Sequence, residues 1–496
     1  MRKVTEKQMQ LGEIDIADIK FDLKSRDEIP KLLKGLQHIY CAKDVKEKVF
    51  EILGEIAPEG KSPNNGRPGM SLWKIFVLGT LRLNCNWDYD KLREIANEHR
   101  TLRMMLQHSE EDEYMYPLQT LRDNVSLLTP ELLEKINDIV ADEGRSLTGK
   151  KKEALMGRCD SWVVETDVHF PTDISLLFDA MRKVIHLTAK IERVAGWRQG
   201  KHLTRKLKKL MRRIQKMKRS SSKNPQKKAA HEEKIRAAYK EYVDEAKSLL
   251  DKARGSLAAV SGSPASDKEA KSLLAIHQFI DHALRQVDQT RRRALQGETI
   301  PHSEKVFSVF EDYTEWISKG KAGVRQELGL RVCLLEDQHG FILSHKVMRR
   351  QTDEKVAVEI TAAAKEKFPA LGGCSYGKGF YTPANKEELS RIVDKVVMPK
   401  KGRLTISEKQ EESAEEFIRA RYKHSAVESA ISAMENHGLD RCPDVGLEAF
   451  HRYVALAVVA RNLQQLGSLI IQKERKSKTR RAKYNRTRAA RQRLSA

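Results

Sequence analysis

The residues of this chain whose type and spacing most clearly indicate chemistry are its lysines and arginines. The chain has 92 Lys and Arg against 69 Asp and Glu, a formal net charge of +23. Residues 201–228 contain 13 basic residues and no acid, and residues 473–493 contain 11 basic residues and one acid, Glu474. Their contributions of +13 and +10 equal the whole net charge. Such concentrated charge predicts a polyanionic partner, nucleic acid first and an anionic membrane surface second.

The first basic segment also has a helical period. A second apolar series of similar spacing follows the break at residues 220–226, so the pattern predicts a helical hairpin with outward-facing basic residues. We favour phosphate contact over a merely solvated helix face, because unopposed cations need a counterion partner. The apolar residues of the first series are Leu203, Leu207, Leu210, Ile214 and Met217.

The second basic segment lies in the tail, residues 471–496. It has few apolar residues, which predicts a disordered arm that neutralises phosphates. Neither segment reveals sequence specificity, since phosphate contacts do not read bases. The side chains expected to contact DNA are Arg205, Lys208, Lys209, Arg212, Arg213, Lys216, Arg480 and Arg481.

Composition argues against several other classes of protein. The six cysteines are scattered without a CxxC pair, unlike a disulfide scaffold or a zinc finger. The apolar run from Tyr453 to Ala460 stops at Arg461, short of the ~18 residues of a membrane helix. The polar N-terminus has no signal-peptide core. We therefore expect a cytoplasmic protein with no membrane segment.

The elements that must position any site fall into five segments. Residues 1–150 predict short helices joined by tight turns, compatible with a helix-turn-helix DNA-binding region or with any small helical bundle. Residues 151–190 begin as a strand and continue into a helix after Pro171. A basic helical insertion is predicted at residues 191–324, and it is followed by a second mixed segment at 325–470 and by the tail.

The mixed segment at 325–470 predicts a hairpin around residues 337–340, helices near 354–367 and 384–393, and strands ending near 376 and 398. Long helices are predicted at 408–436 and 446–471. With the insertion omitted, the elements follow the order of an RNase H-like core, in which carboxylates from different elements meet at one sheet edge. We therefore predict a mainly α protein with an α/β RNase H-like core, although order alone does not establish it.

Four stretches make this prediction more specific. Together they resemble the transposases of bacterial insertion sequences in the D-D-E superfamily, closest to the ISNCY group. The resemblance covers roughly residues 60–190 and 325–467. The stretches are DSWVVETDVHFPTD from residue 160, SYGKGFYTPANKEEL from residue 375, HSAVESAISAMENHGL from residue 424 and GLEAFHRYVALAVVARNLQQLG from residue 446.

The resemblance implies a transposase that cleaves DNA and transfers strands with Mg²⁺ or Mn²⁺. It implies that Asp160 is the first catalytic, metal-binding acid, with Asp167 as second choice, and that Glu428 is the last. Carboxylates suit this chemistry because Mg²⁺ prefers oxygen ligands, and a pair of ions can activate the attacking oxygen and stabilise the leaving one. Arg421 and His424 share a helical face with Glu428, and Arg421 is a further expected DNA contact.

The resemblance also implies partners and a location. The partners are double-stranded DNA, both the element's terminal inverted repeats and its target, and further copies of the chain in a homo-oligomer on DNA. The location is the bacterial cytoplasm, in association with the nucleoid.

One position departs from the family. The second acid begins a D-K-G-F motif, which here reads Gly377-Lys378-Gly379-Phe380, and no carboxylate lies between Glu366 and Glu387. Glycine has no side chain with which to bind metal. The copy is an inactivated relic, or another acid replaces the missing one, or the protein acts only by binding DNA, for example as an inhibitor of active copies. We rank the relic first.

Several other residues carry simpler expectations. Asp337 is the most visible replacement acid, but its place in a hairpin turn favours a turn role. Asp173 is expected to cap a helix, Trp197 to pack in a core, and His424 to be a helix-surface histidine. A third, less favoured class is a protein that binds RNA or an anionic membrane through its basic segments.

Overall fold

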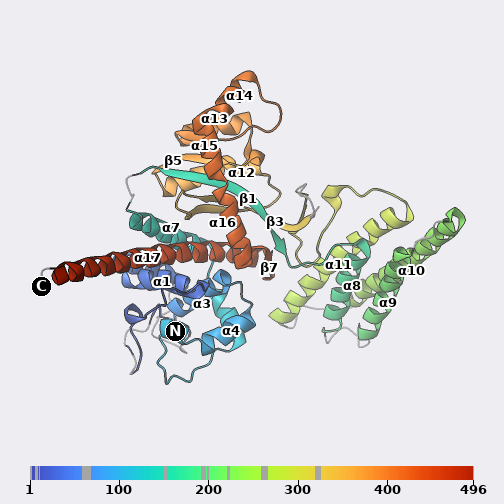
Figure 1. Ribbon diagram of the computed structural model, residues 1–496. Helices are drawn as coiled ribbons and strands as arrows, with labels where there is room; N and C mark the ends of the chain where they lie inside the picture. Colours follow the sequence, from blue (N-terminus) through green and yellow to red (C-terminus); the bar gives the residue numbers. More distant parts are fainter. Residues whose placement is uncertain are drawn as a thin grey trace. The chain divides into compact units, whose positions relative to one another are not determined.

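The computed structural model describes residues 3–5, 9, 12–57, 69–149, 153–191, 197, 200–220, 224–258, 266–318 and 326–494. The chain forms two compact units (Figure 1). The core unit comprises residues 1–167 and 329–496, and the insertion unit comprises residues 168–328. The fold is mainly helical and contains a mixed seven-stranded sheet.

The sheet is built around strand β1 (Leu155–Thr166). β1 runs antiparallel to β3 (Glu327–Glu336) on one side and parallel to β5 (Leu371–Tyr376) on the other. The order is β2-β3-β1-β5-β6, with β4 paired to β3 and β7 to β1. The remaining strands are β2 (Glu315–Ile317), β4 (Ile342–Met348), β6 (Lys395–Val397) and β7 (Arg441–Cys442).

The predicted elements of this region are confirmed, with one difference. The hairpin β3–β4, helix α12 (Asp353–Lys367) and helix α13 (Pro383–Ile392) lie where the patterns place them. The helix predicted at 408–436 is interrupted twice, because Ala414 is extended at φ −62° and ψ 138° and Ser425 forms a turn. The resulting helices are α14 (Ile406–Ser413), α15 (Glu415–His424) and α16 (Ala426–Met434).

The N-terminal helices pack around the C-terminal helix α17 (Leu447–Leu494) (Figure 1). They therefore form one unit with the sheet and not a separate domain. α1, α3 and α7 contact α17 directly. The helices are α1 (Glu28–Cys41), α2 (Lys43–Gly54), α3 (Leu72–Asn84), α4 (Tyr89–Glu98), α5 (Arg100–Met105), α6 (Leu118–Val125) and α7 (Pro130–Leu147).

Helix α17 differs from the sequence expectation in two ways. In the described ranges it is the one helix long and apolar enough to span a membrane, since Arg461 does not lower the mean hydropathy enough to exclude it. That apolar window is 72% buried, as in the core helix of a bundle. The helix also continues through the predicted disordered tail to Leu494. The tail contains no glycine or proline and is rich in Ala, Lys and Arg, which favour helix.

A buried asparagine joins α17 to the sheet. The side-chain oxygen of Asn462 accepts from the Ile342 backbone N–H at 2.9 Å, and its amide donates to the Ile342 carbonyl at 2.9 Å. The same amide lies 2.7 Å from Asn137 Oδ1 of α7. All these groups are satisfied without water, so the network fixes the start of β4 against α7 and α17.

The insertion unit is a bundle of four helices around one apolar core. The predicted hairpin is confirmed as α9 and α10, with Leu207 and Ile214 buried. Trp197 is also buried, and its indole N–H donates to Ser256 Oγ at 3.1 Å, as expected for packing. The helices are α8 (Asp173–Thr188), α9 (Gly200–Arg219), α10 (Pro225–Ala258) and α11 (Asp267–Leu295).

Two sequence expectations change at α8. We placed this helix with the first core segment, residues 151–190, but it packs on α9 and α11 and belongs to the insertion unit. The cap is Thr172 and not Asp173, because Thr172 and Ser175 form a reciprocal capping box. Asp173 lies in the first turn, where it pairs with Arg293 at 2.8 Å.

The crossing of α1 and α17 predicts a specific sensitivity to side-chain size. A Cβ on Gly467 would overlap the backbone of Lys31 and Gly35, which cannot yield as a flexible side chain can. We expect Gly467→Ala to lower the free energy of unfolding by about 1–3 kcal/mol, measured by urea denaturation. Gly54→Ala is the matched control, because a Cβ there meets nothing within 4 Å. Equal stability of the two variants would contradict the close crossing.

Candidate functional site

Asp160 on β1 and Gly377, the residue directly after β5, lie side by side. In the parallel pair of β1 and β5, Cys159 is opposite Tyr376. Asp160 and Gly377 are the residues that follow these two, so they are neighbours as well. A Cβ built on Gly377 would lie 3.0 Å from Asp160 Oδ1. A side chain at 377 would thus contact the Asp160 carboxylate directly.

The backbone at position 377 does not require glycine. Its φ of −64° and ψ of 159° are extended values that any L-residue adopts. The nearest atoms to an added Cβ belong to the carboxylate end of Asp160, which can rotate. An aspartate here requires the Asp160 carboxylate, whose Oδ1 accepts from the Ser161 backbone N–H at 2.8 Å, to shift by a few tenths of an ångström. The backbone conformation itself does not require glycine.

Gly379, two residues later, is different. A Cβ there would overlap the carboxylate of Asp353, which also accepts from Ser161 Oγ at 2.6 Å. Ser161 follows Asp160 on the strand and so faces the other side of the sheet. The sequence did not indicate that Asp353 lies near these positions, because Ser161 and Gly379, which it adjoins, are distant from it along the chain.

His424 and Ser375 lie close to this pair of positions. Ser375 precedes Gly377 by two residues on β5, and its Oγ is 3.0 Å from His424 Nδ1. Burial, with Arg158 and Arg421 nearby, lowers the pKa of His424 to about 4. The imidazole is therefore neutral at pH 7. The expected surface histidine instead turns toward the sheet.

Arg158 and Glu336 form a largely buried ion pair on the same face as Asp160. Arg158 Nη1 is 3.0 Å from Glu336 Oε1, across the antiparallel pair of β1 and β3. Burial raises the pKa of Glu336 to about 7, although Arg158 opposes that shift. Asp160 therefore lies two residues along its strand from a positive charge that is only partly neutralised near pH 7.

Glu428 and Arg421 are carried by α16 and α15. α16 packs on β1 through Val427 and neighbouring buried residues, while Glu428 is exposed at the edge of that buried stripe, as its spacing predicts. Arg421 is also exposed. The helix bearing Glu428 thus covers the strand bearing Asp160. Within the described ranges, no three His, Cys, Asp or Glu side chains gather closely enough to hold a metal.

The two alternative acids lie elsewhere. Asp167 follows the far end of β1, roughly 20 Å from Asp160 at the usual strand rise, and its Oδ1 is 3.8 Å from Arg441. The turn role of Asp337 is confirmed, because its Oδ1 accepts from the backbone N–H of His339 at 2.8 Å and of Phe341 at 2.9 Å. Neither residue neighbours position 377.

The basic residues of α9 are concentrated on one face of the helix. An α-helix turns by about 100° per residue, and on this basis seven cations lie within an arc of about 100° when the helix is viewed along its axis. This arc is opposite the buried residues Leu207 and Ile214. All seven cations are exposed, and in the described part of the chain none forms an ion pair. We call them the α9 stripe: Lys201, Arg205, Lys208, Lys209, Arg212, Lys216 and Arg219.

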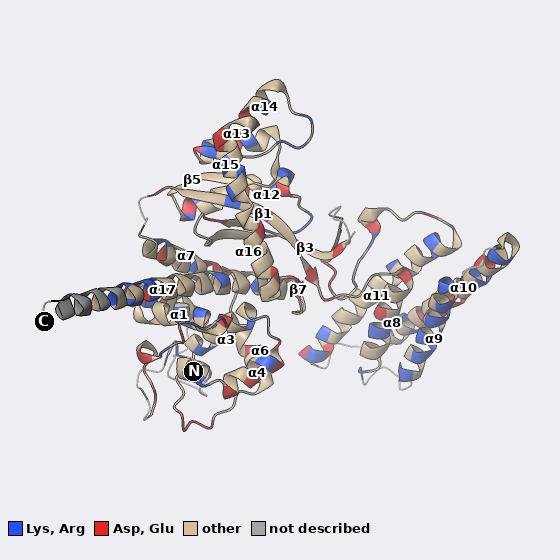
Figure 2. Ribbon diagram, in the orientation of Figure 1, with Lys and Arg blue, Asp and Glu red and all other residues tan. Residues whose placement is uncertain are grey.

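Other cations of the same helix are neutralised. Lys206 pairs with Glu245 at 2.7 Å, and Arg213 pairs with Glu241 at 2.6 Å, both across to α10. Arg213 therefore differs from the five other cations of α9 expected to contact DNA. Figure 2 shows blue Lys and Arg positions along α9, with red acidic positions interspersed along α10. Arg480 and Arg481 are exposed on the last part of α17.

Comparison of the chain with models of protein families, with curated proteins and with solved structures gives no significant match.

Proposed function

We propose that the protein is a D-D-E-type DNA transposase in which the loss of one metal-binding acid, at position 377, has abolished cleavage while leaving DNA binding. The observation that carries this proposal is the position of Gly377. An acid there would face Asp160 across a parallel strand pair, at a distance that allows both carboxylates to share a metal. The Mg²⁺ or Mn²⁺ chemistry belongs to the family that the motifs resemble.

The strand order supports an RNase H-like core as the basis of this proposal. Three antiparallel strands, β4, β3 and β1, continue into two parallel ones, β5 and β6. The expected first acid lies on the central strand, and the expected last acid lies on a helix that packs against it. These elements carry the two expected acids in the order that the motifs predict, which supports the proposal.

A non-catalytic DNA-binding protein is the second candidate function. The α9 stripe supports DNA binding without any catalytic acid, because seven exposed and unpaired cations on one helix face suit contact with phosphates. Such a protein could occupy element ends as an inhibitor of active copies. The DNA ends and a homo-oligomer are proposed as partners in either case.

Restoring the acid tests catalysis. We expect Gly377→Asp to cleave a labelled duplex carrying the repeats that flank the gene, in Mg²⁺ or Mn²⁺, while the unaltered protein does not. The reason is that one acid of the family motif is absent, and an aspartate at 377 would place a second carboxylate beside that of Asp160 after a small shift of the Asp160 side chain. Gly377→Asn is the matched control, since it has nearly the same volume but no charge.

The other outcomes separate the alternatives. Cleavage by the unaltered protein that Glu428→Ala abolishes would mean that another carboxylate has replaced the missing acid, and the relic hypothesis would be wrong. Binding of the duplex by both proteins without cleavage by either would favour the non-catalytic function.

The pairing pattern on α9 predicts which cations bind phosphate. Replacing Arg205, Lys208 and Arg212 by serine should weaken duplex binding and reduce the slope of log K against log salt by roughly three, about one per lost contact. Replacing Lys206 and Arg213, whose charges are already neutralised by glutamates, should change the slope little. Fluorescence anisotropy over a range of salt concentrations measures both. Equal effects per charge would show that net charge alone governs binding.

A further inference from the structure

The insertion unit contains a cavity whose walls combine aromatic rings, cations and an unsatisfied amide. It has a volume of about 580 Å³ and is bounded by the start of α8, the ends of α9 and α11, and the segment at 302–316. We call it the aromatic cavity. Its size suits a small aromatic ligand with a polar group. Its lining residues belong to the insertion unit, whereas Asp160 and Gly377 belong to the core unit.

One wall is a chain of contacting rings. Phe170 and Trp316 meet edge to face with centroids 5.4 Å apart, and Phe307 lies 5.6 Å from Trp316 and 5.2 Å from His302. Phe170 is 62% exposed, which is unusual for a large apolar side chain. Exposed rings of this kind offer faces on which a planar ligand can stack.

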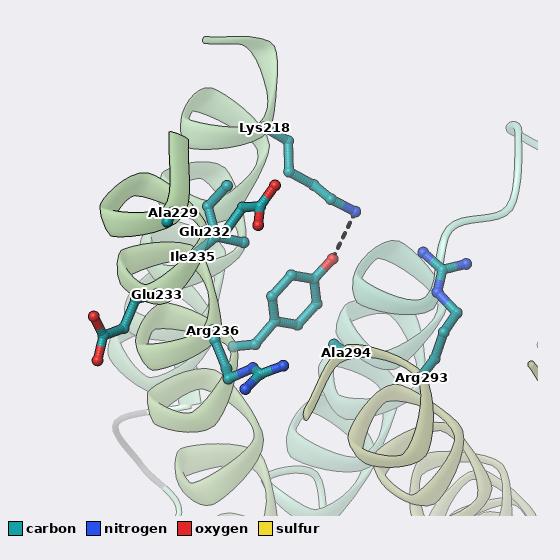
Figure 3. A pocket seen from close by; sticks show the side chains of 9 residues that line it. Lys218, Ala229, Glu232, Glu233, Ile235, Arg236, Arg293 and Ala294 are labelled. Atoms are coloured by element: carbon teal, nitrogen blue, oxygen red, sulfur yellow. Dashed lines mark hydrogen bonds between the residues drawn. The ribbon is translucent and has the colours of Figure 1, made fainter. Parts of the chain in front are cut away.

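The other walls are strongly positive. Lys218, Arg219, Arg293 and Lys305 line the cavity, against the one carboxylate of Asp173, which pairs with Arg293. Lys218 donates to the Tyr239 hydroxyl at 2.8 Å. Lys218, Tyr239 and Arg293 also line the adjoining pocket of Figure 3, in which a dashed line marks the hydrogen bond from Lys218. The excess of cations calls for an anionic ligand.

A buried amide lies in the same cavity without a partner. Gln286 is 1% exposed, and in the described part of the chain neither its Oε1 nor its Nε2 makes a hydrogen bond. A buried amide is normally satisfied on both atoms, so both polar atoms of Gln286 have hydrogen-bonding capacity that a ligand could use. A side-chain amide offers a donor and an acceptor together, which matches the edge of a nucleobase.

The α9 stripe leads to this cavity. Arg219 is the last cation of the stripe and also lines the cavity, and the stripe extends about 27 Å from Lys201 at the rise of an α-helix. A nucleic-acid backbone that follows the stripe would therefore bring its next base to the aromatic wall. An acidic peptide would satisfy the cations, but it has no planar group with a donor and an acceptor on one edge for both the rings and Gln286.

We propose that the aromatic cavity holds one unstacked nucleotide of a DNA strand whose phosphates lie along the α9 stripe. The base would stack on Phe170 and Trp316, its edge would pair with Gln286, and its phosphate would contact Lys218 and Arg219. The proposal rests on the DNA binding in the proposed function, but it does not depend on cleavage or on position 377.

The test measures binding of the full chain, in EDTA, to a short duplex with a three-nucleotide single-stranded tail that contains 2-aminopurine. A blunt duplex of the same sequence is the comparison. We expect tighter binding of the tailed duplex and a fall in 2-aminopurine fluorescence as the base stacks. Phe170→Ala should weaken binding of the tailed duplex roughly 5- to 150-fold and leave the blunt duplex unchanged. Phe170 is largely exposed, so its removal should leave the fold intact.

Two further variants sharpen the test. Gln286→Leu keeps the side-chain volume and removes the amide, so it should also reduce the preference for the tail. Phe310→Ala is the matched control, since Phe310 is another exposed aromatic of the same unit that does not line the cavity. Thermal melts check that each variant is folded.

Several results would overturn the proposal. Equal binding of tailed and blunt duplexes, or equal weakening of both by Phe170→Ala, would remove the base site while leaving DNA binding intact. If free deoxynucleoside monophosphate displaced the tailed duplex at an equal concentration, the ligand of the cavity would be a free nucleotide and not a DNA strand. Displacement by a glutamate-rich peptide containing tryptophan would make the ligand a protein. Failure to bind any DNA would contradict the proposed function as well.

Discussion

The parallel register of β1 and β5 is the constraint on which the interpretation of this protein depends. A slip of one residue would turn position 377 to the opposite face of the sheet from Asp160. Several contacts oppose such a slip. Gly373 leaves room for the Met156 side chain, where any Cβ would collide with it, and the Tyr376 hydroxyl lies 2.7 Å from Thr361 Oγ1 of α12. The adjacency of Asp160 and Gly377 is therefore set by packing on both strands.

Two groups of helices pack against this sheet. Asn462 and Asn137 hold the start of β4, and with it the β3–β4 hairpin, against a bundle that includes both ends of the chain. α15 and α16 cover the strands on the side where His424 meets Ser375. The insertion unit instead carries its own apolar core and the α9 stripe. The Asp160–Gly377 pair and the α9 stripe thus belong to different compact units of the chain.

Local patterns predicted much of this arrangement, and contacts between distant segments explain the rest. The hairpin around Asp337 and the apolar seam through Leu207 follow from short-range periodicity and turn chemistry, so they were predictable. The neutralisation of Arg213 by Glu241 was not, because it requires the pairing of two helices. The inward turn of His424 and the transfer of α8 to the insertion unit depend likewise on tertiary packing. The motif showed that Gly377 departs from the family pattern, but only the structure shows that this position lies beside Asp160.

The most direct test of the central claim is a count of bound Mn²⁺ by electron paramagnetic resonance on three proteins: the unaltered chain, Gly377→Asp, and Gly377→Asp combined with Asp160→Ala. The account predicts tight Mn²⁺ binding in Gly377→Asp alone, because two adjacent carboxylates form a site that either one alone does not. Binding by the unaltered chain as tight as by Gly377→Asp, or binding that survives Asp160→Ala, would contradict the claim that position 377 is the missing partner of Asp160.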